Sequence, residues 1–163
     1  ARIYAEVLGY GCSGDAYHIA APDEQGAGAF RSMKMALREA ELNPEQIAYI
    51  NAHGTSTPLG DKAEVTAVKR LFGDAAKSLA MSSTKSVTGH ALGAAGGIES
   101  VATILAIVND TLPPTINLDT PDEGMDLNLV PHVPQQRKTD YAINNSFGFG
   151  GHNTSLVFGR FRG

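Results

Sequence analysis

Two histidines stand in similar loops rich in glycine, serine and threonine. His53 lies in NAHGTSTPLGD (51–61), and His90 lies in STKSVTGHALGAAGG (83–97), which also carries Lys85. An imidazole can donate a hydrogen bond or transfer a proton near neutral pH, and small neighbours let a substrate approach it. The two loops are therefore typical of the polar part of an active site, and they raise the question of which nucleophile they serve.

Each histidine also has a simpler interpretation. His53 could be a loop residue bonded to the backbone, while Thr55 and Thr57 cap the following helix. His90 could do no more than cap the apolar helix that we expect after it, although a helix N-terminus also keeps an imidazole neutral and able to donate to a developing oxyanion. The two loops alone leave these alternatives open.

Lys85 and Glu99 form the second chemical pattern. Glu99 lies one-third along an apolar stretch, and burial of a lone carboxylate is costly unless a cation pairs with it. We expect Lys85 to be that partner, in a buried ion pair that holds the loops in place. The alternative is that Glu99 occupies a solvent-facing stripe and Lys85 lies in solvent.

The segment FGFGGHN (147–153) is the third pattern. It lies between two expected strands and opens no helix, which argues against a nucleotide-binding loop. Gly148 and Gly150 allow a tight turn that exposes backbone N–H groups, and Phe147 and Phe149 supply apolar walls. We expect an oxyanion donor and a gate here.

Metal binding is not expected. The five histidines lack ligand spacing, and the single cysteine, Cys12, is close in sequence only to His18. Cys12 also lacks a basic neighbour or a helix start directly after it, so a plain loop residue is a better interpretation than a nucleophile.

Hydrophobic periodicity predicts the elements that position these residues. A D-x-x-E pattern at Asp61 and Glu64 predicts a helix start, and the apolar stretch 91–109 predicts a buried helix. The region 110–140, rich in Pro, Asp and Asn, is expected to be irregular surface. The remaining expected elements are strands at 2–9, 47–51, 79–82, 141–146 and 154–158, a loop at 12–22 and a helix at 26–41.

This order predicts an α/β fold with a mixed, mostly parallel sheet and helices packed on it. Binding sites in such sheets gather beyond the carboxyl ends of the strands. Both histidine loops and the glycine loop follow strands directly, so we expect them to meet at one edge.

Composition narrows the function further. The chain has 163 residues, a formal net charge of −4 and a pI near 5.7, which argue for one domain and against nucleic-acid binding. A single cysteine suits a reducing cytoplasm. The longest apolar stretch, 98–108, is too short to cross a membrane and contains Glu99. Because the sequence begins with Ala1, we expect a fragment of a longer protein.

NAHGTSTPLGDKAE, SSTKSVTGHALGAAGGIES and NNSFGFGGHN, in this order, resemble the elongating β-ketoacyl-acyl-carrier-protein synthases of the synthase II type. GYGCSGDAYHIAAP and TLPPTINLDTPDEGMDLNLVP also match, so the resemblance covers the whole chain. It covers only the carboxyl-terminal half of the family, whose thiolase-like fold pairs two similar halves in a layered αβαβα architecture. The resemblance thus implies one domain, 1–163, with the amino-terminal half and its nucleophilic cysteine absent.

The resemblance implies a decarboxylative condensation of a malonyl thioester with an acyl thioester. His53 and His90 would hydrogen-bond the malonyl thioester oxygen, and Lys85 would organise the site. The N–H of Phe149 would share an oxyanion hole with the cysteine N–H of the other half, while its ring gates the acyl pocket.

Further roles and partners follow from the same resemblance. Thr55 and Thr57 would bind the phosphopantetheine arm of acyl carrier protein, which carries the substrates, so no cofactor is bound to the chain itself. Structural support would come from Glu99, Asp61, Gly148 and Gly150. The complete enzyme would be a homodimer, and this chain alone would be inactive.

Two alternatives to the fatty-acid synthase interpretation remain open. The chain could be a non-catalytic carrier-protein-binding or chain-length-factor-like subunit, or half of a polyketide ketosynthase. A thiolase is disfavoured, because thiolases use a second cysteine near the carboxyl terminus and 140–163 has none.

Overall fold

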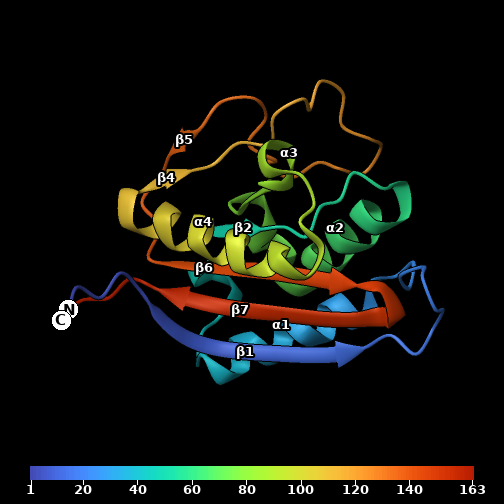
Figure 1. The fold of residues 1–163 in the computed structure, drawn as a ribbon, viewed down its shortest axis with the longest axis horizontal. Coiled ribbons are helices and arrows are strands. Elements are labelled where there is room, and N and C mark those ends of the chain that lie inside the picture. The colour runs from blue at the N-terminus through green and yellow to red at the C-terminus, as the bar shows by residue number, and fades with distance from the viewer.

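The computed structural model describes residues 1–163 and is built on one five-stranded sheet (Figure 1). The strand order is β1 (Glu6–Gly14), β7 (His152–Gly159), β6 (Tyr141–Gly148), β2 (Tyr49–Asn51) and β3 (Ala80–Ser82). The β1/β7 and β7/β6 pairs are antiparallel, and the β6/β2 and β2/β3 pairs are parallel. The predicted α/β fold with a mixed sheet is confirmed, but parallel pairs do not predominate.

Helices cover the sheet on both faces (Figure 1). Helices α1 (Ala27–Glu39) and α2 (Pro58–Phe72) lie on one face, and α4 (Ala95–Asn109) lies on the other. The shorter elements are α3 (Lys85–Thr88), a two-stranded sheet of β4 (Thr111–Leu112) and β5 (Gln135–Gln136), and 3-10 turns at Pro44–Gln46, Gly73–Lys77, Leu92–Ala94 and Phe149–Gly151.

The alternation of side chains along the strands creates a separate core on each face. Ile50 and its neighbours Ile143 and Val157 pack toward α1 and α2. One residue earlier on β2, Tyr49 joins the opposite cluster with Ile107 of α4. Successive strand residues point to opposite faces, so one short strand contributes to both cores.

Two glycines in β1 let α1 lie directly on the sheet. A Cβ atom at Gly9 would stand 2.1 Å from the Ala36 carbonyl oxygen, and one at Gly11 would stand 1.9 Å from that of Ser32. No side chain fits at either position without moving the helix. The strand also continues through Cys12 to Gly14, so the loop predicted from Cys12 begins later than expected, and Cys12 is an exposed strand residue.

Helix α4 differs from the prediction of a buried helix. It begins at Ala95, after a 3-10 turn, and buries only one stripe, which includes Glu99 and Ala106. On its open face, Ile98, Val101 and Leu105 are 43%, 58% and 46% exposed. Apolar residues on nearly every face of the helix indicated burial. The spacing of these residues does not show, however, whether another segment covers each face.

The apolar stretch around α4 is longer than the sequence analysis assumed. Leu92–Asn109 spans 18 residues with a mean hydropathy of 1.5, which suffices by length and composition to cross a membrane. The core helix of a soluble protein meets the same criterion. In this fold α4 packs on β6 and β2 and carries the buried Glu99.

Two further predictions need correction. Asp61 and Glu64 do not cap α2, because the helix begins earlier, at Pro58 after Thr57. The region 110–140 is mostly irregular, but it is not all surface: Leu112, Val130 and Thr139 are fully buried. This segment packs beside β3, where Met81 N donates to Asn128 O at 2.9 Å.

Candidate active site

Three strands deliver the predicted residues to one edge of the sheet. Parallel strands β2, β3 and β6 end together, and the loops after them carry His53, then Lys85 and His90, then Phe149. The convergence expected from strand order is therefore present. The loops 51–61, 83–97 and 147–153 meet although they are far apart in sequence.

A cavity of about 720 Å³ opens between these loops. Its lining includes His53, His90, Thr55, Thr57 and Phe149. Gly148 and Glu64 also line it, whereas Lys85, Glu99, Asp61, Gly150 and Cys12 do not. The structure thus divides the predicted site residues into those that reach the cavity and those that lie behind it.

His53 is the more enclosed of the two histidines. Its ring lies 5.5 Å from the His90 ring, edge to face, and 6.0 Å from the Phe147 ring. Burial lowers the pKa of His53 to about 3, with smaller contributions from the charges of Lys85 and His90. Its buried Nδ1 atom has no hydrogen-bond partner within the chain. His53 is therefore a neutral imidazole, which suits a hydrogen-bond donor to a developing oxyanion.

Glu64 holds the His53 loop from the α2 side. Its carboxylate accepts from the backbone N–H of His53 at 3.1 Å and of Gly54 at 3.0 Å. Asn145 Nδ2 of β6 donates to the same carboxylate at 3.0 Å. Burial raises the pKa of Glu64 to about 6, although these hydrogen bonds favour the charged form.

This role of Glu64 was not predicted from the sequence. The D-x-x-E pattern before an apolar run is a local capping signal and predicted a helix cap instead. The contacts of Glu64 with His53 and Asn145 depend on the packing of α2 against β2 and β6. The one available signal was a glutamate among the apolar residues Ala63, Val65 and Val68, where a charge needs partners.

Lys85 and Glu99 form the ion pair that the sequence predicted. Their side chains are 4% and 1% exposed, so the pair is buried. Apart from each other, Lys85 Nζ and both carboxylate oxygens of Glu99 have no hydrogen-bond partner in the chain. The pair joins α3 to α4 behind the cavity.

His90 occupies a different setting from the one predicted. It is exposed and stands five residues before α4, so it does not lie at the start of that helix. Its Nδ1 accepts a hydrogen bond from Leu92 N at 3.3 Å, within the turn that precedes α4. The dipole of α4 therefore does not act on His90 as the sequence analysis expected.

The glycine loop turns back tightly between β6 and β7. Gly150 and Gly151 have φ angles of 79° and 72°, which favour glycine. Gly150 N donates to Ile19 O at 2.8 Å, so this N–H is already used. The Phe149 ring is 81% exposed at the cavity wall. This placement suits a mobile aromatic wall, as the gate hypothesis requires.

The two threonines lie on the His53 side of the cavity. Thr55 Oγ1 and Thr57 Oγ1 are 3.0 Å apart; Thr57 is exposed and Thr55 is half-buried. Thr57 directly precedes α2, but its side chain does not cap the helix. The hydroxyls are therefore available to a ligand in the cavity.

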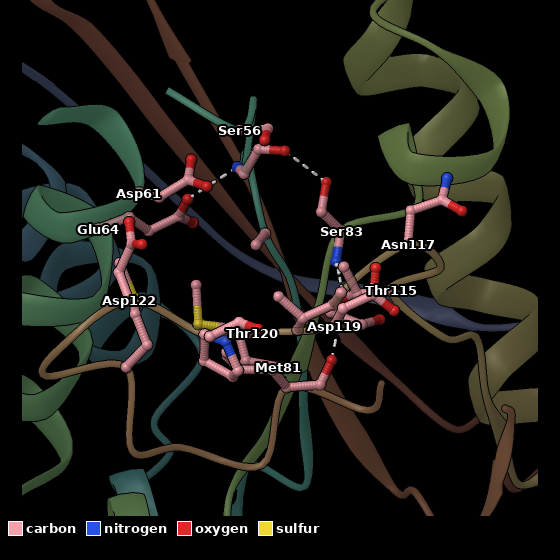
Figure 2. A pocket seen from close by; sticks show the side chains of 17 residues that line it. Ser56, Asp61, Glu64, Met81, Ser83, Thr115, Asn117, Asp119, Thr120 and Asp122 are labelled. Atoms are coloured by element: carbon pink, nitrogen blue, oxygen red, sulfur yellow. Dashed lines mark hydrogen bonds between the residues drawn. The ribbon is translucent and has the colours of Figure 1, made fainter. Parts of the chain in front are cut away.

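A second, smaller cavity has a volume of about 390 Å³. Figure 2 shows the side chains that line it. Asp61, Ser83 and Thr115 line it, and Glu64 lines both cavities. Burial raises the pKa of Asp61. The wall between the cavities is thus formed by the His53–Gly54 backbone and Glu64.

No group of three or more His, Cys, Asp or Glu side chains lies in an arrangement that could hold a metal ion. The prediction that the site uses no metal stays a prediction.

Comparison with known proteins identifies the family. Residues 4–119 match the family described as "Beta-ketoacyl synthase, C-terminal domain". This match covers more than half of the chain and includes both histidines and the Lys85–Glu99 pair. The chain belongs to the β-ketoacyl synthase family. The family resemblance stated from the sequence motifs is confirmed.

Two curated relatives of this β-ketoacyl synthase domain share a name. The chain is 55% identical over 159 residues to 3-oxoacyl-[acyl-carrier-protein] synthase 2 of Vibrio harveyi, covering 97% of this chain and 38% of the relative. It is 56% identical over 160 residues to that of Coxiella burnetii, covering 98% and 39%. The chain thus spans about two-fifths of the length of these relatives.

Solved structures agree on the fold. A ketosynthase of a type II polyketide synthase, in complex with its acyl-carrier protein, has a TM-score of 0.96 at 39% identity, over 99% of this chain and 40% of that one. A β-ketoacyl synthase from Burkholderia phymatum has a TM-score of 0.93 at 40% identity, over 99% and 39%. The thiolase-like ketosynthase half predicted from the resemblance is confirmed.

Proposed function

We propose that this chain supplies the carboxyl-terminal domain, 1–163, of a condensing enzyme that makes 3-oxoacyl-acyl-carrier protein in fatty-acid elongation. The observation that carries the proposal is the edge-to-face pair of His53 and His90, with ring centres 5.5 Å apart in a cavity that Thr55, Thr57 and Phe149 also line. The names of the curated relatives support it.

In the proposed reaction, a cysteine of the amino-terminal half holds the acyl group as a thioester. Malonyl carrier protein then binds, and CO₂ leaves as the electron pair of its C–C bond forms an enolate. Neutral His53 and His90 donate hydrogen bonds to the thioester oxygen as its negative charge grows. The enolate carbon attacks the acyl thioester, and the cysteine thiolate leaves.

Other residues of the chain support these steps. The Phe149 N–H would donate to the oxyanion formed during attack, together with the N–H of the cysteine. Its ring would open and close the acyl pocket, with Gly148 and Gly150 allowing the movement. The hydroxyls of Thr55 and Thr57 fit the amide groups of a phosphopantetheine arm, and no other cofactor is required.

The same proposal includes the partners and the setting. The amino-terminal half would cover the open face of α4, where Ile98, Val101 and Leu105 are exposed. The complete protein would be a cytoplasmic homodimer that binds acyl carrier protein. The chain alone would be inactive, because it carries no cysteine at the cavity: Cys12 lies on β1 and outside it.

A direct test joins this chain to the amino-terminal region of the Vibrio harveyi relative, giving what we call the joined protein. We expect it to convert malonyl and acyl carrier protein to 3-oxoacyl carrier protein, and we expect His53→Ala to abolish this reaction. Condensation by the 163-residue chain alone would overturn the assignment of the nucleophile.

A polyketide ketosynthase half is the second candidate, and one observation favours it. Solved neighbours include the polyketide ketosynthase above and a ketosynthase/chain length factor with a TM-score of 0.94. Higher identity, 55% against 39%, supports the fatty-acid assignment. The joined protein would be a polyketide enzyme if it released chains with several keto groups, made by repeated condensation. A fatty-acid enzyme would instead release one 3-oxoacyl product per acyl group.

A further inference from the structure

We propose that Ser83 is a positioning residue that fixes the His53 loop against the loop carrying Lys85 and His90. The inference rests on the proposed function for its catalytic consequence, but its structural basis is independent. Ser83 Oγ donates to the Gly54 carbonyl oxygen at 2.6 Å, one of the dashed lines in Figure 2. The bond joins the residue after His53 to the residue two before Lys85.

This bond joins the two loops beyond the point where the pairing of the strands ends. The parallel pairing of β2 with β3 ends at Asn51 and Ser82, and the last backbone bond runs from Ala52 N to Ser82 O at 2.9 Å. Beyond it the chains diverge, since α3 begins at Lys85. Two side-chain bonds join the loops here: Thr84 Oγ1 donates to Asn51 Oδ1 at 3.2 Å, and Ser83 Oγ donates to Gly54 O. The Ser83 bond is the one that reaches the residue next to His53.

Gly54 is held at both of its backbone polar groups. Its N–H donates to Glu64 Oε2 at 3.0 Å, and its carbonyl accepts from Ser83 at 2.6 Å. A Cβ atom at Gly54 would lie 2.7 Å from the Ser83 Cβ, and its φ angle of 34° also suits glycine. The close approach that the hydroxyl needs therefore depends on a glycine after His53.

Ser83 itself is fixed on its other side. Its backbone N–H donates to Thr115 Oγ1 at 3.1 Å, and its carbonyl accepts from Ser86 Oγ at 2.8 Å. Ser86 Oγ in turn accepts from Ile116 N at 3.0 Å. Ser83 is only 9% exposed. Because the backbone of Ser83 is fixed in this way, its hydroxyl can fix the position of the Gly54 carbonyl.

The consequence concerns the geometry of the two histidines. Gly54 follows His53 directly in the chain. A shift of the Gly54 backbone therefore moves the His53 imidazole away from His90 and exposes that imidazole to water. A displacement of about 1 Å at a catalytic group can cost about 100-fold in rate. Loss of the Ser83 hydroxyl should therefore lower the rate of the chemical step more than it weakens substrate binding.

The test compares Ser83→Ala with Ser82→Ala in the joined protein. Ser82 is the matched control, because it is the buried residue directly before Ser83 but its hydroxyl bonds Pro113 O at 2.6 Å and Tyr49 Oη at 2.9 Å, away from the histidine loop. We expect Ser83→Ala to lower kcat for malonyl decarboxylation by about 10- to 100-fold with little change in KM. Ser83→Thr, which keeps a hydroxyl, should retain most of the rate.

A second readout does not depend on condensation. Carbethoxylation of His53 by diethyl pyrocarbonate, followed by mass spectrometry against pH, reports its accessibility and its pKa. Ser83→Ala should speed this labelling and raise the midpoint toward an ordinary histidine, whereas Ser82→Ala should leave both unchanged. If Ser83→Ala does not fold, Ser83→Cys, a weaker donor of similar size, should shift both in the same direction.

The outcomes separate the two proposals. An inactive wild-type joined protein would contradict the proposed function, while the His53 labelling would still decide the role of Ser83. Equal labelling and equal kinetics for the Ser82 and Ser83 variants would overturn the positioning role.

Discussion

The two histidine loops meet in one cavity but are held in different ways. His53 is enclosed, and the next residue, Gly54, is bonded by Glu64 at its N–H and by Ser83 at its carbonyl. His90 is exposed, and its one hydrogen bond within the chain lies inside its own turn, to Leu92 N. This domain therefore fixes the His53 loop by contacts from two other elements, whereas it leaves the His90 side chain exposed and bonded only within its own turn.

The largest expected effect on stability comes from breaking the buried Lys85–Glu99 ion pair behind the His90 loop. Glu99→Ala leaves the Lys85 ammonium buried and unpaired, which should lower the free energy of unfolding by about 3–5 kcal/mol. Urea denaturation measures the loss. The control is Asp74→Ala, which removes an ion pair with Lys77 whose side chains are 96% and 82% exposed and should change stability little. Equal effects of the two variants would contradict a buried pair.

The next effect concerns the His53 loop. Glu64→Gln puts an amide NH₂ group where the carboxylate now accepts from His53 N, Gly54 N and Asn145 Nδ2. At least one donor then loses its acceptor, which should cost about 1–3 kcal/mol. Urea denaturation at a pH above 7 isolates this loss, and an unchanged midpoint would show that the carboxylate does not hold the loop.

The pH dependence of stability tests the burial of the Glu64 carboxylate. Burial raises the pKa of Glu64 from its ordinary 4.5 to about 6, so the folded chain binds this proton more tightly than the unfolded chain. The resulting stabilisation is complete below pH 4.5 and disappears as pH rises through 6. It amounts to about 2 kcal/mol by linkage. The difference in unfolding free energy between wild type and Glu64→Gln should follow this curve, and a difference independent of pH would contradict it.

The smallest expected effect is an absence of change. With a pKa of about 3, His53 should show no shift of its imidazole resonances between pH 5 and 8 in ¹⁵N-histidine NMR. Glu64→Gln should bring a titration of His53 into this range if the loop opens to water. A midpoint near 6.5 in the unaltered chain would show that His53 is not desolvated.

Much of the site was predictable because its signals are local. Residue spacing placed the histidine loops after strands, and the rule that sites gather at strand ends brought them together. The Lys85–Glu99 pair followed from the cost of a lone carboxylate on an apolar helix. These arguments need only the order of the expected elements and the residues of each motif.

The missed features depend on tertiary packing. Glu64 was assigned to a cap, because a capping pattern and an inward-facing glutamate have the same local sequence. Helix α4 was expected to be buried, since apolar residues occupy nearly every face, yet Val101 is 58% exposed. The start of α4 at Ala95 also removed His90 from the helix end. Local sequence cannot tell which other segment faces a side chain.

The most direct test of whether two such unlike loops form one site is a double-mutant cycle on malonyl decarboxylation by the joined protein. His53→Ala, His90→Ala and the double variant are compared with wild type. The proposed function has both imidazoles donate to one oxygen, so we predict that the double variant is little slower than the slower single variant. Losses that multiply would contradict a shared site and would mean that the two histidines act independently.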